Sequence, residues 1–132
     1  MATVSEIRTA LATKMADVYG LRTSAHVPDN PRPPMAVVMP ERIIYDTNAN
    51  RGLDSLTFTI TVLVGRADDR AAQQNLDKYL LGDDSVKGAI EADRTLGGKV
   101  QSCRVTEMNA YQQVPVGETL MLGAQLTVEV WA

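Results

Sequence analysis

A polar–apolar alternation that gives way to a helical pattern runs through residues 54–81, and it constrains the fold more than any other feature. Leu56, Phe58, Ile60, Val62 and Val64 alternate with Ser55, Thr57, Thr59 and Thr61. This period of two predicts a half-buried strand. Gly65 breaks the alternation, and Asp68-Asp69 opens a predicted helix whose apolar residues share one face. A strand and a helix therefore share one core.

Helical patterns occur in two further segments. Thr3 and Glu6 have the spacing of a capping box, and the apolar stripe that follows predicts a helix over residues 4–19, ended by Gly20. Residues 82–85 end one helix and cap a shorter one, which Gly97-Gly98 is expected to close.

Further strands are predicted on both sides of the central segment: residues 22–27, residues 35–39, an extended stretch at 41–45 after an interruption by Pro40, residues 100–108 and residues 118–131. Residues 112–117 are expected to form a hairpin connection. The order is roughly α-β-β-β-α-α-β-β. It predicts an α+β fold, with a largely antiparallel sheet and with the N-terminal helix and two central helices packed on one face.

Composition places the chain among globular domains. Its 132 residues are 45% hydrophobic and 22% charged, with only 5% aromatic, which predicts one domain (1–132) with a mainly aliphatic core. No apolar run approaches a membrane span, and the N-terminus has no apolar signal core, so we expect assembly in the cytoplasm. The net charge is −3, and scattered Lys and Arg argue against a protein that grips nucleic acid through its phosphates.

Residues able to carry chemistry are few. Cys103 is the only cysteine, which excludes an internal disulfide and favours a small strand residue. His26 is the only histidine, and no nucleophile elbow accompanies it. The pairs Asp68-Asp69 and Asp83-Asp84 stand where helices start, so capping is favoured over metal binding. No phosphate-binding loop or dinucleotide fingerprint is present. We therefore expect no catalytic residue, no metal and no cofactor.

Five segments carry a family resemblance: ATVSEIRTALATKMADVYGLR, HVPDNPRPPMAVV, RGLDSLTFTITVLVGRADDRAAQQNLDKYL, SVKGAIEADRTLGG and GAQLTVEVWA. Together they cover nearly the whole chain, and none is a catalytic motif. In these segments the chain resembles the tail-terminator proteins of long-tailed, siphovirus-type bacteriophages, a head-to-tail connector family of actinobacterial phages and prophages.

The resemblance implies a structural virion protein rather than an enzyme. Such a subunit assembles into a ring, typically a hexamer, at the neck between head and tail. The ring caps the head-proximal end of the tail tube, stops tube polymerisation and joins the tail to the head connector. Its implied partners are further copies of itself, the major tail tube protein and a head-tail connector or stopper protein. Genomic DNA passes through the lumen without sequence-specific binding, and no membrane is involved.

Candidate subunit or tube contacts follow from loops and from two strand faces. Residues 28–34, residues 47–53 and the 112–117 hairpin are the candidate loops. Two strand faces are further candidates. One is the threonine face of strand 55–63. The other is the second face of the last strand, which is covered either by a partner or by the chain's own helices. The candidate residues are Pro31, Pro33, Asn48, Arg51, Asp54, Thr57, Thr59, Gln113, Pro115 and Trp131.

Three alternatives remain open at this point. The chain could be another neck protein, such as a stopper, adaptor or tail-completion protein. It could be a small enzyme that acts through Asp68, Asp69 and His26, although these residues offer no pair of roles at usable spacing. It could also be a small-molecule-binding α+β module, which predicts a monomer or dimer rather than a ring.

Overall fold

A single sheet with three helices makes up the part of the chain that the computed structural model describes, namely residues 3–15, 22–24, 35–45, 54–66, 70–80, 85–98, 100–116 and 119–131. The elements are α1 (Val4–Met15), β1 (Arg22–Ser24), β2 (Met35–Ile44), β3 (Ser55–Arg66), α2 (Arg70–Leu80), α3 (Val86–Glu91), β4 (Ser102–Val116) and β5 (Thr119–Trp131). The predicted element order and the α+β class are confirmed.

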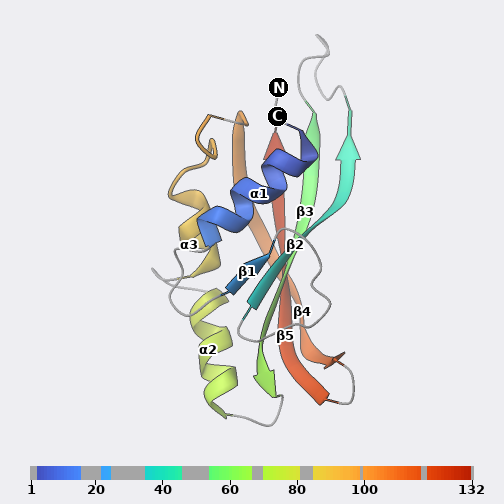
Figure 1. The fold of residues 1–132 in the computed structure, drawn as a ribbon, viewed down its shortest axis with the longest axis vertical. Helices are drawn as coiled ribbons and strands as arrows, with labels where there is room; N and C mark the ends of the chain where they lie inside the picture. The colour runs from blue at the N-terminus through green and yellow to red at the C-terminus, as the bar shows by residue number, and fades with distance from the viewer. Residues whose placement is uncertain are drawn as a thin grey trace.

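The sheet has the strand order β1-β2-β3-β5-β4. Its neighbours are antiparallel except for β1 and β2, which are parallel. All three helices lie on the same side of the strands, and the hairpin that joins β4 to β5 lies at the lower end of the molecule (Figure 1). β4 is therefore an edge strand over its full length, whereas β3 and β5 are central.

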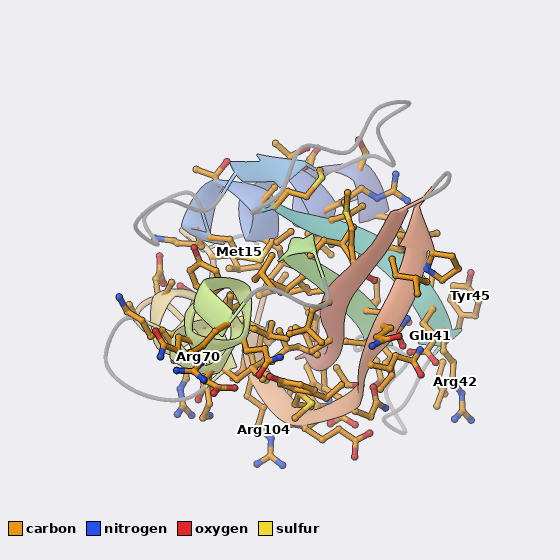
Figure 2. The ribbon with its side chains drawn as sticks, turned by 90° about the horizontal axis from the view of Figure 1, so that it is seen from below. Met15, Glu41, Arg42, Tyr45, Arg70 and Arg104 are labelled. Atoms are coloured by element: carbon orange, nitrogen blue, oxygen red, sulfur yellow. The ribbon has the colours of Figure 1, made fainter. Side chains whose placement is uncertain are left out.

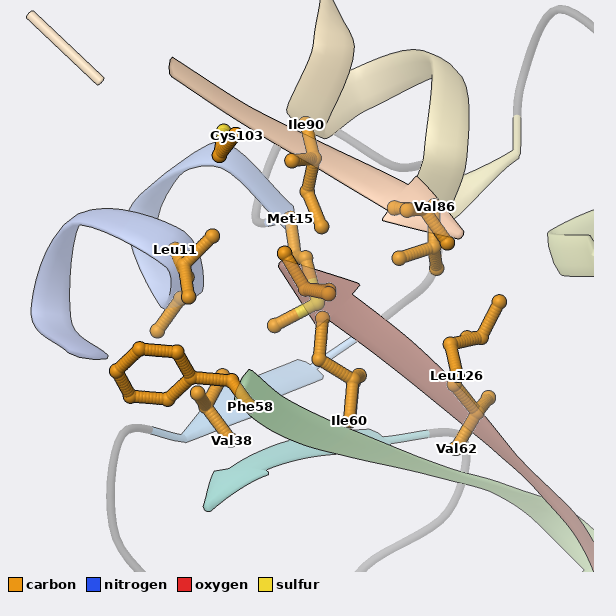
Figure 3. Close-up of a cluster of buried hydrophobic side chains, with 14 of the residues drawn as sticks. Leu11, Met15, Val38, Phe58, Ile60, Val62, Val86, Ile90, Cys103 and Leu126 are labelled. Atoms are coloured by element: carbon orange, nitrogen blue, oxygen red, sulfur yellow. The ribbon is translucent and has the colours of Figure 1, made fainter. Parts of the chain in front are cut away.

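The core forms between the helices and one face of the sheet. Cross-strand register places Phe58 opposite Val128 and Ile60 opposite Leu126, and all four side chains are buried. Leu11 and Met15 of α1 and Val86 and Ile90 of α3 pack onto this layer (Figure 3). The alternation predicted for residues 55–64 is thus confirmed, and its apolar half faces the helices.

Two predicted interruptions of strands are bulges instead. β2 continues through Pro40, with a register shift between Pro40 and Arg42. β3 continues through Gly65 to Arg66, with a shift between Leu63 and Gly65, and Gly65 has a φ of 139°. A bulge adds one residue to one strand and bends it without ending the pairing, so a strand breaker in the sequence need not end a strand.

The expected hairpin connection at residues 112–117 was wrong. Gln112–Val116 belong to β4 and pair with Gly123–Thr119 of β5, so the connection lies between Val116 and Thr119. Pro115 is compatible with this arrangement because β4 is an edge strand, where one residue without an N–H need not interrupt a ladder. A second shift between Asn109 and Gln112, with Ala110 at φ 58°, bends β4 before the hairpin.

Helix ends agree with the predicted caps where they are described. The Thr3 hydroxyl accepts from the Glu6 amide at 3.1 Å, and the Ser85 hydroxyl accepts from the Gly88 amide at 3.1 Å. The predicted part of the first helix after Met15, and both Asp pairs, lie outside the described residues. The last helix ends at Glu91 and not at Gly97-Gly98, since residues 92–98 form turns.

Candidate functional site

Cys103 is a core residue. It lies on β4 opposite Val130, and its side chain is fully buried. Burial, followed by the nearby charges of Glu91 and Asp93, raises the pKa of the Cys103 thiol to about 11. Since the thiolate is the reactive form, this thiol is inert at neutral pH. The prediction of a small strand residue is confirmed.

The remaining chemical candidates fall elsewhere. His26, Asp68-Asp69 and Asp83-Asp84 lie outside the described residues. Within the described ranges, no group of three or more His, Cys, Asp or Glu side chains could hold a metal ion. Ser85 directly follows the second Asp pair in the sequence and is the N-cap of α3, so this residue has a structural role.

The helix-free face of the sheet carries a stripe of hydroxyl groups. Thr57, Thr59 and Thr61 of β3 lie opposite Glu129, Thr127 and Gln125 of β5, respectively. The three β3 threonines are half-buried. The Thr59 hydroxyl donates to Glu41 Oε2 at 2.8 Å, which links the stripe to β2. No helix covers this face (Figure 1). Of the two alternatives for the second face of β5, cover by the chain's own described helices is therefore not observed, and burial against a partner stays a prediction.

Apolar residues lie beside this stripe on β2. Met35 and Val37, with Leu63 of β3, form a small buried cluster separate from the main core. Farther along β2, Met39 is 46% exposed and Ile44 is 42% exposed, and Tyr45, directly after the strand, is 70% exposed. The apolar row thus begins buried and ends at the surface.

A groove of about 410 Å³ lies on another side of the molecule, between α3 and β4. Its lining combines apolar and charged residues: Leu80, Lys87, Glu91, Arg94, Arg104, Val105, Thr106, Glu107, Met108 and Leu126. Glu91 binds both Lys87 and Arg94, at 2.9 Å in the second case. Among the described residues, neither Arg104 nor Glu107 takes part in an ion pair. Two opposite charges in the groove lining are therefore without a described ion pair.

Tyr111 connects β4 to α2 through a hydrogen bond. Its hydroxyl donates to Asp77 Oδ1 at 3.1 Å, although the side chain is 41% exposed. Partial burial, then the hydrogen bond to Asp77 and its charge, raise the pKa of the Tyr111 phenol. The shift has the direction expected for a phenol that donates a hydrogen bond to a carboxylate.

Comparison of the chain with protein-family models and with curated proteins finds no match. None of the helices within the described ranges is long and apolar enough to cross a membrane. The candidate surfaces must therefore be judged on their own geometry.

The predicted contact residues do not form one site. Thr57, Thr59 and Trp131 lie on the helix-free face, where Trp131 pairs with Ser55, and Asp54 directly precedes β3. Gln113 and Pro115 are exposed near the β4–β5 hairpin, at the other end of the sheet (Figure 1). The remaining four candidates lie outside the described residues: Pro31, Pro33, Asn48 and Arg51.

Sequence reasoning missed the end of β2 and the groove. Glu41, Arg42 and Tyr45 lie together on one side of the molecule, whereas Arg104 extends from a different side (Figure 2). The sequence signal for the first surface was a run of apolar residues, Ile43 to Tyr45, that continues beyond Pro40. The groove had no local signal, because residues from α2, α3, β4 and β5 meet there only after folding.

Proposed function

We propose that this chain is a structural subunit of the phage neck, a tail terminator that forms a ring, typically hexameric, on the head-proximal end of the tail tube. The ring stops tube growth, joins the tail to the head connector and leaves a central passage for DNA. The family resemblance of the sequence motivates the proposal. The distribution of exposed apolar side chains supports it.

That distribution is the observation on which the proposal rests. Six large hydrophobic side chains are exposed among the described residues, and each lies on a strand or directly after one: Met39, Ile44, Tyr45, Met108, Tyr111 and Leu120. Single exposed apolar residues are ordinary, but aligned ones indicate contact surfaces. The described helices contribute none. A subunit that works through the faces and edges of its sheet would expose its apolar residues in this way.

The chemistry of the helix-free face is compatible with a DNA conduit. Its central stripe consists of hydroxyl and amide side chains with one carboxylate, Glu129, and the whole chain carries a net charge of −3. A strongly basic wall would hold DNA through its phosphates, whereas a weakly acidic subunit lets the DNA pass. These features support passage without sequence-specific binding.

Deletion of the gene from the phage that encodes the protein tests the role. We expect abnormally long tails by negative-stain electron microscopy, and normal lengths again when the gene is supplied in trans. Tails of normal length with leaking heads would instead assign a stopper or another neck role. Normal tails on intact, infectious particles would exclude a neck function.

The mass of the protein in solution distinguishes a ring from a small-molecule-binding module, which would be a monomer or dimer. Light scattering after size exclusion is run on the protein alone and with purified tail tubes. A ring of six chains has six times the chain mass of 14.3 kDa. A monomer or dimer under both conditions contradicts the ring. The enzyme alternative predicts that changing Asp68, Asp69 and His26 together to alanine abolishes function while leaving assembly intact, whereas we expect the triple variant to keep both assembly and normal tail length.

A further inference from the structure

The exposed apolar residues divide into two groups on different parts of the sheet. The first group, the β2 patch, consists of Met39, Ile44 and Tyr45 with the neighbouring charges Glu41 and Arg42. Beyond Val37, β2 has no partner on its outer side among the described residues, because β1 pairs only with Met35–Val37. The β2 patch therefore lies at one margin of the sheet.

The second group lies at the opposite margin, where β4 is the edge strand. Met108 is 41% exposed and lines the α3–β4 groove beside Leu80 and Leu126. Arg104 and Glu107 flank it on β4. Met, Tyr and Arg are residues that protein interfaces favour, and both margins carry them.

One opposite-charge pair can form between the two surfaces, although the β2 patch as a whole, with Glu41 and Arg42, has no net charge. Arg104 lies opposite Glu129 of its own sheet but makes no described ion pair with it. The groove carries Lys87, Arg94 and Arg104 against Glu91 and Glu107, so it holds one excess positive charge. Glu91 already neutralises part of the α3 side, whereas Arg104 has no ion-pair partner among the described residues. On the β2 patch, Glu41 accepts one hydroxyl from Thr59 and makes no described ion pair. Arg104 and Glu41 can therefore pair between copies.

Direct strand-to-strand pairing of the two margins is disfavoured. β4 has register shifts between Val105 and Glu107 and between Asn109 and Gln112, while Pro40 and a further shift interrupt β2. Bulges, prolines and charges are the usual features that prevent a strand edge from pairing with another chain. Contact through side chains remains the available mode.

We propose that the β2 patch of one copy docks into the α3–β4 groove of the next, with Tyr45 and Ile44 against Met108 and with Glu41 beside Arg104. The two surfaces differ and lie at opposite margins of one sheet, so the contact is heterologous. Repetition of a heterologous contact closes into a ring when the rotation between copies allows it. This inference rests on the proposed function and names the surfaces that connect its subunits.

Cysteine capture tests the contact directly. Tyr45→Cys and Met108→Cys are introduced together, and the protein is oxidised at high concentration and read on a non-reducing gel. The buried Cys103, with its raised pKa, does not compete. We expect a ladder above the dimer, because each copy offers two different surfaces. Each single variant, and the mismatched pair Lys78→Cys with Tyr45→Cys, should give at most dimers.

Charge exchange gives an independent readout of the same contact. Arg104→Glu and Glu41→Arg should each weaken assembly on the order of tenfold, and combining them in one chain should restore it. Lys78→Glu is the matched control, since Lys78 is exposed on α2 and lies outside the groove. An unchanged single variant, an unrestored double variant, or no ladder above the controls overturns the proposed contact.

The two proposals fail in different ways. A wild-type ring of six chains that tolerates all of these substitutions would retain the terminator function and refute the contact. Normal tails on infectious particles after gene deletion would refute the terminator function, whatever the cross-linking shows.

Discussion

Phe58 provides the sharpest test of which face of β3 is buried. It is the only phenylalanine in the chain, its side chain is fully buried, and it lies opposite Val128 on β5. Its ring packs beneath α1 close to Leu11 and Val38 (Figure 3). Phe58→Ala removes the ring and leaves a cavity between the sheet and α1, which neighbours on a sheet and a helix can close only partly.

The expected cost is large compared with the stability of the domain. Phe-to-Ala changes in cores cost about 3–5 kcal/mol. A domain of this kind is expected to have a free energy of unfolding of about 5–15 kcal/mol. Its entropy of unfolding, about 0.28 kcal/mol/K from the per-residue average, converts the loss into a melting temperature lower by about 11–18 °C.

The matched control is Thr57→Val, one residue away on the opposite face. Thr57 is half-buried on the helix-free face, and valine keeps its branched shape. We expect its effect to stay within about 0.5 kcal/mol. Both variants are measured by urea unfolding and by scanning calorimetry. A Phe58→Ala loss below about 1 kcal/mol, or a Thr57→Val loss equal to it, would refute the assigned register and burial.

Three further predictions concern single side chains. Ser85→Ala should destabilise the protein by about 1 kcal/mol in urea unfolding, because Ser85 caps α3 and is 2% exposed, whereas Ser85→Asp should retain most of the cap; equal stability of the alanine variant and the wild type would contradict this role. The pKa of Cys103, raised from 9.0 to about 11 by burial, predicts a stability contribution that is intact below pH 9 and is lost between pH 9 and 11, and that loss should be absent from the Cys103→Ala unfolding profile. Hydrogen bonds from Thr95 and Gly97 lower the pKa of Asp93 below 3.8, so an NMR titration should show a lower midpoint, and Asp93→Asn should remove stability that is present above pH 3.8 and is lost as the pH falls through the folded pKa.

The fold could be predicted from sequence because its patterns are local. The alternation around Phe58 fixed both the strand and its buried face, and the Thr3 cap marked the start of α1. The errors occurred where a residue that usually ends a strand lies in a strand whose hydrogen-bonded neighbour continues to pair. Gly65 and Pro40 interrupt an alternation in the sequence, yet each lies in a strand whose neighbour continues to pair on both sides of the shift. Pairing energy from the adjacent strand, which the sequence window does not include, decides such positions.

Contact surfaces were harder to predict for a related reason. Pro31 and Asn48 were chosen as contact candidates because they belong to predicted proline-rich or polar loops. The exposed apolar side chains that the structure describes lie instead on strands or directly after one. Met39 and Val37 have the same apolar character and the same side of β2, yet one is 46% exposed and the other 8%. No sequence pattern separates them, because the difference depends on what lies beyond each residue after folding.

The two margins of the sheet differ in a way that favours directional assembly. β1 extends the β2 margin by three residues, and within the described ranges Val38–Ile44 have no outer neighbour, whereas the β4 margin is one strand of fifteen residues flanked by α3. Identical margins would favour a two-fold contact, which ends at a dimer. Different margins that offer one opposite-charge pair, Glu41 on one and Arg104 on the other, favour a head-to-tail contact that repeats until it closes. A ring at the end of a tube requires such a repeat, since each subunit must present one surface to the copy before it and another to the copy after it.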